Sequence, residues 1–228
     1  MPPAESVYQH SSDELENDLR SADIVVRSLL ETISPQSVLD VGCGLGHFTR
    51  KFLDSGIKDV LAVDGDYLNP ELLCIPREYF CSADLTRAFD FGRKFDLVVS
   101  LEVGEHLPPE CAEQFVECLV RHGEAVLFSA AFPGQGGQNH LNEQWATWWA
   151  QQFRRHGYMP FDLIRPKLLD NSDLPPWYRF NTMLYAQPGL IPSVPMRADF
   201  LEHVLNGGLG IKLSARCLLA SIRRKLRR

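Results

Sequence analysis

Three features are missing from this sequence of 228 residues. It has no run of eighteen apolar residues, so we expect no membrane-spanning helix. Its polar, acidic N-terminus lacks the basic and apolar parts of a secretory signal. Its six cysteines include no Cys-x-x-Cys pair and no zinc-type cluster with histidine. These absences predict a cytoplasmic protein with reduced thiols and no metal site.

Positive charge is scarce over most of the chain and concentrated at its C-terminus. The net charge is −6, although residues 212–228 contain seven basic residues and no acidic one. An acidic body argues against a nucleic-acid groove, so we expect no nucleic-acid partner. We interpret the basic tail as a helix with a solvated end; weak contact with an anionic membrane surface is the alternative. Nothing in the sequence fixes the oligomeric state.

Apolar runs and helical patterns alternate between residues 37 and 130. Short apolar segments predict buried strands, and the amphipathic segments between them predict helices. The expected strands are 37–41, 59–64, 79–85, 95–102 and 124–130, and the expected helices are 11–33, 46–54, 69–74 and 108–122. This alternation is typical of a doubly wound α/β sheet, whose ligands bind at the carboxyl ends of the strands.

The pattern changes after residue 130. A glycine-rich loop precedes a tryptophan-rich segment, 141–157, which predicts a helix, and residues 161–169 and 180–186 predict two more strands. We therefore expect an N-terminal helical cap at 1–34, a ligand-binding core at 35–188, and a helical, basic C-terminal extension at 189–228.

The first expected strand ends in the turn Asp-x-Gly-x-Gly-x-Gly, from Asp40 to Gly46. The dinucleotide fingerprint Gly-x-Gly-x-x-Gly would need its third glycine at His47, which leaves an NAD-dependent oxidoreductase as a distant alternative. The carboxylate of Asp40 would repel a pyrophosphate at the helix N-terminus. It suits a ligand with a cationic amino-acid end and no phosphate, and S-adenosylmethionine (SAM) is such a ligand.

Acidic residues also end the next strands. Asp64 ends the second, where a carboxylate can accept hydrogen bonds from two ribose hydroxyls, and Asp84 ends the third, where it can accept one from the adenine amine. The segment 100–107, SLEVGEHL, ends the fourth strand at the place expected for the methionine part of the cofactor.

With these four elements in order, residues 38–130 resemble the class I SAM-dependent methyltransferases. The resemblance implies a Rossmann-like, seven-stranded sheet with an antiparallel last strand. It also implies a SAM-binding core at 35–188, with S-adenosylhomocysteine as the product. The cofactor-binding residues are then expected to be Asp40, Gly42, Cys43, Gly44, Gly46, Asp64, Gly65, Ala83, Asp84, Leu85, Leu101 and Glu102.

Two histidines follow strands at this edge of the sheet. A hydroxyl acceptor needs a base, and histidine is the usual base near neutral pH. His106 follows the fourth strand and His140 follows the fifth, and we prefer His140. A structural role in the loop is the alternative for His106. A metal site from Glu102, His106 and His140 has no support from the spacing.

The loop 134–145, GQGGQNHLNEQW, together with the later segment 177–186, WYRFNTMLYA, resembles segments of bacterial methyltransferases that modify sugars, polysaccharides and secondary metabolites. It favours O-methylation of a small-molecule or sugar-containing acceptor. An N-methyltransferase, or a methyltransferase of protein or nucleic acid, is the alternative. The expected acceptor-binding residues are Asn139, Asn142, Gln144, Trp145, Arg165 and Tyr178. Asn142 as the N-cap of the following helix is a second interpretation of that residue.

Overall fold

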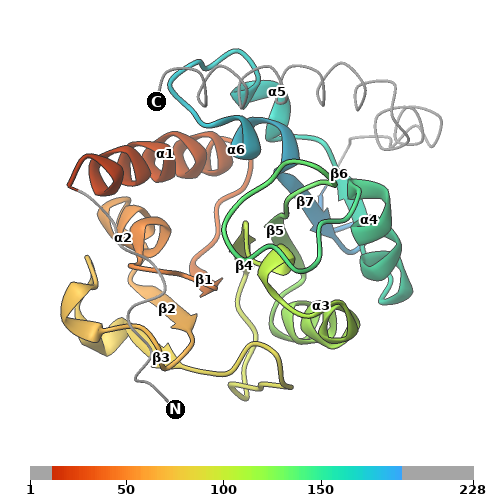
Figure 1. The fold of residues 1–228 in the computed structure, drawn as a ribbon, viewed down its shortest axis with the longest axis horizontal. Coiled ribbons are helices and arrows are strands. Elements are labelled where there is room, and N and C mark those ends of the chain that lie inside the picture. Colours follow the sequence, from red (N-terminus) through yellow and green to blue (C-terminus); the bar gives the residue numbers. More distant parts are fainter. Residues whose placement is uncertain (1–11, 192–228) are drawn as a thin grey trace.

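The computed structural model describes residues 12–191 and contains one seven-stranded sheet (Figure 1). The strand order is β3-β2-β1-β4-β5-β7-β6. The strands are β1 (Ser37–Val41), β2 (Asp59–Asp64), β3 (Phe80–Ser82), β4 (Leu97–Leu101), β5 (Ala125–Ser129), β6 (Met159–Phe161) and β7 (Met183–Ala186). The expected doubly wound sheet of the class I methyltransferase type is therefore present.

The direction of the strands also agrees with the expectation. Strands β1 to β5 are parallel to one another, whereas β7 is antiparallel to both β5 and β6. The strand order reverses between β1 and β4. The strands that follow β1 in the sequence, β2 and β3, lie on one side of it in the sheet, and β5 follows β4 on the other side. The carboxyl ends of these two strands form the crevice in which ligands of such sheets bind.

Helices cover both faces of the sheet. Helices α1 (Ser12–Leu30), α2 (His47–Asp54) and α5 (Arg165–Leu168) pack on one face, and α3 (Ala112–His122) and α4 (Ala146–Arg155) pack on the other. Strand residues alternate between the two cores: Val98 faces α3 and α4, while Leu97 and Val99 face α1 and α2. Both faces are apolar, which explains the near-continuous apolar runs in the sequence.

Three sequence predictions in the second half of the chain were wrong. The strand expected at 161–169 is the short β6 followed by helix α5, which has Pro166 in its first turn, where a missing N–H is tolerated. Phe180 and Asn181, the first two residues of the last expected strand, belong instead to helix α6 (Pro176–Asn181). Helix α4 begins at Ala146, with Trp145 in the N-cap position, so Asn142 does not cap it.

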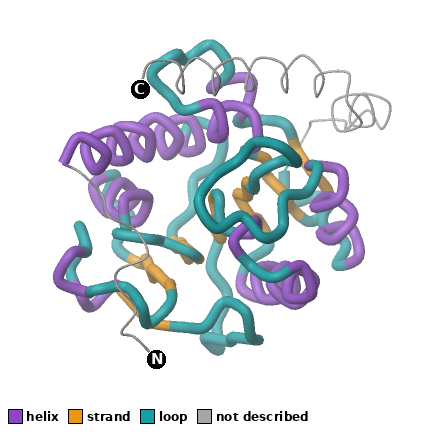
Figure 2. The backbone as a smooth tube through the Cα atoms, in the orientation of Figure 1, coloured by secondary structure: helices purple, strands orange, loops and turns teal. Residues whose placement is uncertain are grey.

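A long loop between β5 and α4, residues 130–145, crosses the carboxyl edge of the sheet; Figure 2 shows it as a continuous tube without helix or strand. No helix within residues 12–191 is long and apolar enough to span a membrane. The basic tail and the helices expected beyond residue 191 lie outside the described residues.

Candidate functional site

The glycine turn after β1 has the geometry that its sequence suggests. Gly42, Gly44 and Gly46 all have positive φ values, of 79°, 54° and 87°, which favour glycine. A Cβ atom on Gly42 would lie 2.3 Å from Val103, whereas one on Gly44 would meet nothing within 4 Å. Close packing therefore requires glycine at position 42, whereas Gly44 has open space beside its backbone.

Asp64, at the end of β2, holds this turn in place. One carboxylate oxygen accepts the backbone N–H of Gly44 at 2.8 Å, and the other accepts that of Gly65 at 2.7 Å. The Tyr67 hydroxyl donates to the second oxygen as well. The carboxylate is thus aimed into the turn at the position expected for ribose hydroxyls, and Tyr67 occupies part of that position.

Asp40 is buried behind the same turn. Its Oδ2 atom accepts hydrogen bonds from the Thr49 hydroxyl at 2.6 Å and from the Thr49 backbone N–H at 3.1 Å, which ties β1 to helix α2. Burial raises the pKa of Asp40 to about 6, against the hydrogen bonds from Thr49, and Asp64 adds to the rise. Burial likewise raises the pKa of the neighbouring Cys43 thiol well above its usual value, which argues against a nucleophile.

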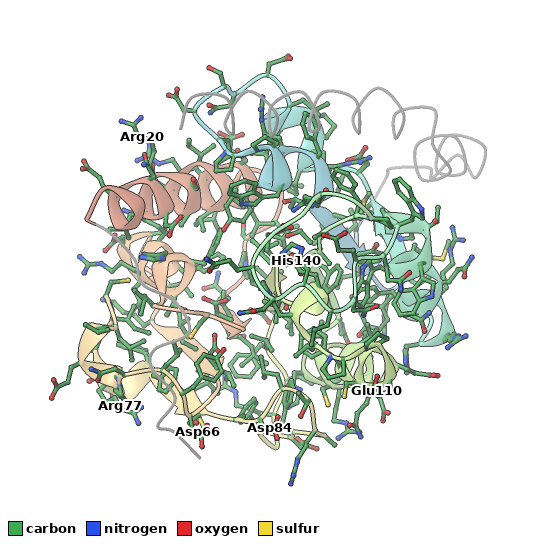
Figure 3. All side chains as sticks on the ribbon, in the orientation of Figure 1. Arg20, Asp66, Arg77, Asp84, Glu110 and His140 are labelled. Atoms are coloured by element: carbon green, nitrogen blue, oxygen red, sulfur yellow. The ribbon has the colours of Figure 1, made fainter. Side chains whose placement is uncertain are left out.

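Asp84 lies two residues beyond the end of β3, and Figure 3 shows it well apart from His140. Its Oδ1 accepts from the hydroxyl and N–H of Thr86, and its Oδ2 pairs with Arg87 at 3.1 Å. The hydrogen bonds from Thr86 lower the pKa of Asp84, so it is charged. Ala83 donates its N–H to the Asp64 carbonyl, and Leu85 is buried.

Glu102 follows the buried Leu101 at the end of β4 in a left-handed conformation, with φ of 54°. For a residue other than glycine this conformation is strained, and such strain is concentrated at functional sites. Its carboxylate accepts hydrogen bonds from Gln135 at 3.0 Å and Asn181 at 3.2 Å. Burial raises its pKa, and hydrogen bonds, with Ser129 the strongest, oppose the rise.

Glu105 anchors the long loop and presents a second carboxyl group next to Glu102. Its backbone carbonyl accepts the N–H groups of Leu141 and Asn142, at 2.7 and 2.9 Å. Its side chain is 0% exposed. Burial, and next the Glu102 carboxylate, raise the pKa of Glu105 well above its usual value.

The two histidines predicted from the sequence meet at this point. The ring centroids of His106 and His140 are 5.0 Å apart, with the rings edge to face. His140 Nδ1 lies 2.8 Å from the Glu143 carboxylate, which also accepts the N–H groups of Gly134 and Gly136. Burial, and then the adjacent His140, lower the pKa of His106. Figure 3 places His140 over the carboxyl ends of β4 and β5.

The acceptor-binding candidates in the loop differ in their exposure. Asn139 is exposed with φ of 57°, while Asn142 is buried and accepts from the Gln144 side chain at 3.0 Å. Trp145 is 47% exposed and stacks on Phe132. Trp145 therefore offers a free aromatic face at the rim, and Asn142 supports the loop from within.

The structure pairs Arg165, which we expected at the acceptor, with residues outside this arrangement. It is buried on α5, pairs with both oxygens of Asp162 at 2.8 and 2.6 Å, and donates to the Phe180 carbonyl. It therefore ties α5 to α6. Tyr178 packs edge-on against Phe48, and burial, followed by the charge of Glu102, raises the pKa of Tyr178 strongly.

Comparison with known proteins decides the family. Residues 14–164 match the family of proteins described as "Methyltransferase domain". The chain belongs to this methyltransferase family. With the class I fold and the glycine turn, it is a SAM-dependent methyltransferase.

Solved structures with the same fold cover most of the chain. DesVI of Streptomyces venezuelae is 15% identical, with 79% of this chain and all of that chain covered (100%), at a TM-score of 0.54. The magnesium protoporphyrin IX methyltransferase of Synechocystis PCC 6803 is 16% identical. The match covers 79% of this chain and 89% of that chain, at a TM-score of 0.54. The methyltransferase domain of a bacterial Hen1 is 18% identical. The match covers 75% of this chain and 98% of that chain, at a TM-score of 0.51.

Several residues of the methyltransferase site were missing from the sequence prediction. Glu143, three residues after His140 in the loop, orients that histidine. This spacing could have been recognised in the sequence. Gln135 and Asn181 contact Glu102 and each other, the latter at 2.8 Å. They come from separate segments, so only the folded chain reveals their meeting.

Proposed function

We propose that this methyltransferase transfers the methyl group of SAM to a hydroxyl oxygen of a small-molecule or sugar-containing acceptor. In this reaction the acceptor oxygen forms a bond to the methyl carbon while the bond from that carbon to the sulfonium sulfur breaks. The products are the methyl ether, neutral S-adenosylhomocysteine and one proton. The protein has to align the two reactants and to help the hydroxyl lose its proton.

The observation that carries this proposal is the contact between His140 and Glu143. In a neutral imidazole, the nitrogen that donates to a carboxylate carries the proton, and the other nitrogen keeps a lone pair. With Nδ1 held by Glu143, Nε2 of His140 has that lone pair. His140 is thus the proton acceptor that the chain itself supplies, with His106 beside it.

For the cofactor, the proposal assigns the ribose to Asp64, the close backbone approach to Gly44, and the adenine amine to Asp84. The methionine end then lies toward Glu102, next to the histidines. For the acceptor, it assigns the rim of the loop, with Asn139, Gln144, Trp145 and the adjoining Tyr178. Asn142 supports these residues from the interior, where it is 2% exposed.

The test uses SAM labelled in its methyl group. Labelled SAM and the enzyme are added to a cell extract, which is then separated into small polar, lipid, protein and nucleic-acid fractions. Variants Asp64→Asn and His140→Ala are compared with Asp66→Asn, a change at an exposed neighbour of Asp64. The proposal expects label in the small polar fraction, lost with Asp64→Asn and His140→Ala and kept with Asp66→Asn.

Two results would contradict it. Label confined to protein or nucleic acid would replace the acceptor class by a macromolecule. Label in a small molecule that survives His140→Ala, with a new N–CH3 bond in the product, would favour N-methylation, which needs no base of this kind.

A further inference from the structure

Three donor groups of the site converge on one point. One ligand atom each from Glu105, His106 and His140 lies within 4.8 Å of the other two. Glu105 and His106 belong to the turn η3 (Gly104–His106) after β4, and His140 belongs to the loop after β5. The carboxyl ends of neighbouring parallel strands thus bring together residues that are 34 positions apart in the sequence.

Glu105 is the member of this cluster whose surroundings are incomplete. Its side chain is fully buried, and neither carboxyl oxygen has a hydrogen-bond partner with standard geometry among the described residues. The carboxyl group of Glu102 lies next to it. A buried carboxylate beside a second carboxylate is costly unless a proton or a cation lies between them.

The two histidines are already oriented for binding. His140 contacts the Glu143 carboxylate through Nδ1, and His106 interacts with the backbone carbonyl of Asn139. Ligand histidines in proteins are usually held in this way, by a carboxylate or carbonyl on the ring nitrogen that faces away from the metal. Glu143 is itself fixed by the N–H groups of Gly134 and Gly136.

We propose that Glu105, His106 and His140 bind one divalent first-row transition cation, with Glu102 next to it. Two imidazole nitrogens and a carboxylate oxygen, without sulfur, suit Mn²⁺, Fe²⁺, Co²⁺ or Zn²⁺. With metal–ligand bonds of about 2.1 Å, three donors on one face of a tetrahedral or octahedral ion lie about 3.0–3.4 Å apart. Donors at the 4.8 Å limit therefore have to move inward by about 1 Å each when the ion binds.

The inference rests on the proposed function and changes one step of it. An acceptor hydroxyl bound at an open position of the cation has a lower pKa and releases its proton to water in the site. The oxygen then takes the methyl group as described above. The lone pair of His140 is in this case a ligand of the cation, and the proton acceptor is no longer a side chain.

The test measures binding of Mn²⁺ directly. The purified chain is freed of metal with a chelator, which is then removed, and free Mn²⁺ is followed by electron paramagnetic resonance during titration. Glu105→Gln and His140→Ala are compared with Glu110→Gln, an exposed glutamate outside the cluster. We expect one Mn²⁺ per chain, at least tenfold weaker binding in both cluster variants, and unchanged binding in Glu110→Gln. Thermal unfolding and S-adenosylhomocysteine binding show that each variant is folded.

Three results would overturn the inference: no saturable binding of Mn²⁺, Co²⁺ or Zn²⁺ to the folded wild type, equal binding by folded Glu105→Gln and His140→Ala, or full methyl transfer by the metal-free enzyme. The last result would leave the proposed function intact. Conversely, saturable binding that depends on Glu105 and His140 supports the cation site even if no hydroxyl acceptor is methylated, which would contradict the proposed function alone.

Discussion

His140 and Glu143 form a hydrogen-bonded pair, with 2.8 Å between Nδ1 and Oε1, inside a loop that has no regular secondary structure. Glu143 accepts two backbone N–H groups of the same loop, so one carboxylate orders both the loop and the histidine. Orientation of His140 is needed whether its Nε2 atom accepts a proton or binds a cation. The pair therefore has consequences that hold under either mechanism.

Glu143→Ala should lower kcat/KM by about 10- to 100-fold, the usual effect of removing a carboxylate that orients a functional histidine. Affinity for S-adenosylhomocysteine should stay unchanged, because the glycine turn is elsewhere. Steady-state kinetics and calorimetric binding check the two halves. Glu143→Gln keeps an acceptor for Gly134 or Gly136 and should lose less activity. Equal losses in both binding and turnover would mean that Glu143 supports the whole domain instead.

Gly137→Ala should disturb His140 by contact alone. A Cβ atom at this position would lie 2.2 Å from His140 Nε2 and 2.4 Å from its Cε1 atom, closer than real contacts allow. Since displacement of a reacting group by about 1 Å can cost about 100-fold in rate, we expect a loss of that order with little change in stability. Gln138→Ala, at the exposed neighbouring position, is the matched control. Activity of Gly137→Ala at the control's level would mean that the position of His140 does not matter.

Asp40→Asn should change the pH dependence of stability. The pKa of Asp40 is raised to about 6 in the folded chain from 3.8, so the folded state holds its proton over that interval while the unfolded state does not. Wild-type stability therefore falls as pH rises from about 3.8 to 6, by about 3 kcal/mol at most from this group. An asparagine side chain does not titrate, so this pH-dependent contribution to stability is absent in the variant. Its amide oxygen can still accept hydrogen bonds from Thr49.

Urea unfolding of wild type and Asp40→Asn between pH 4.5 and 7.5 measures this effect. The difference in unfolding free energy should shift in favour of Asp40→Asn as pH rises and level off above the pKa of about 6. Asp66→Asn, at an exposed position near the same turn, should run parallel to the wild type. A constant difference between Asp40→Asn and the wild type across this range would show that Asp40 titrates in the same way in both states.

Local signals in the sequence carried the cofactor half of the site. The glycine turn and Asp64 follow strands whose apolar runs are unambiguous, and parallel pairing of β1 with β2 then brings Gly44 to Asp64 at 2.8 Å. The same rule placed His106 and His140 at one edge of the sheet, where their rings meet. To predict that these residues meet needs only strand identity and direction.

The acceptor half depends on contacts between loops, which no local pattern specifies. Asn181 reaches Glu102 from the end of α6, whereas we expected this residue to lie in the last strand. Arg165 was assigned to the acceptor by its residue type beside aromatic residues. Asp162, which lies three positions earlier and just before α5, forms an ion pair with it. A short-range ion pair was the simpler interpretation of that spacing.

Tyr67 should compete with the cofactor for Asp64. Its hydroxyl donates to the carboxylate oxygen that also accepts the N–H of Gly65, in the position assigned to a ribose hydroxyl. A ligand that uses this oxygen has to displace the tyrosine hydroxyl, and a hydrogen bond of this kind contributes about 0.5–1.5 kcal/mol. Tyr67→Phe removes the hydroxyl but keeps the ring that covers Gly65. Affinity for S-adenosylhomocysteine should therefore rise about two- to tenfold.

Isothermal titration of wild type, Tyr67→Phe, Asp64→Ala and the double variant Tyr67→Phe/Asp64→Ala distinguishes competition from support. If Tyr67 competes through Asp64, the gain from Tyr67→Phe disappears in the Asp64→Ala background, because the shared carboxylate is gone. A lower affinity of Tyr67→Phe would instead mean that the hydroxyl itself contacts the cofactor. In that case Tyr67 leaves Asp64 on binding and donates to the ligand, and the turn after β2 closes over the ribose.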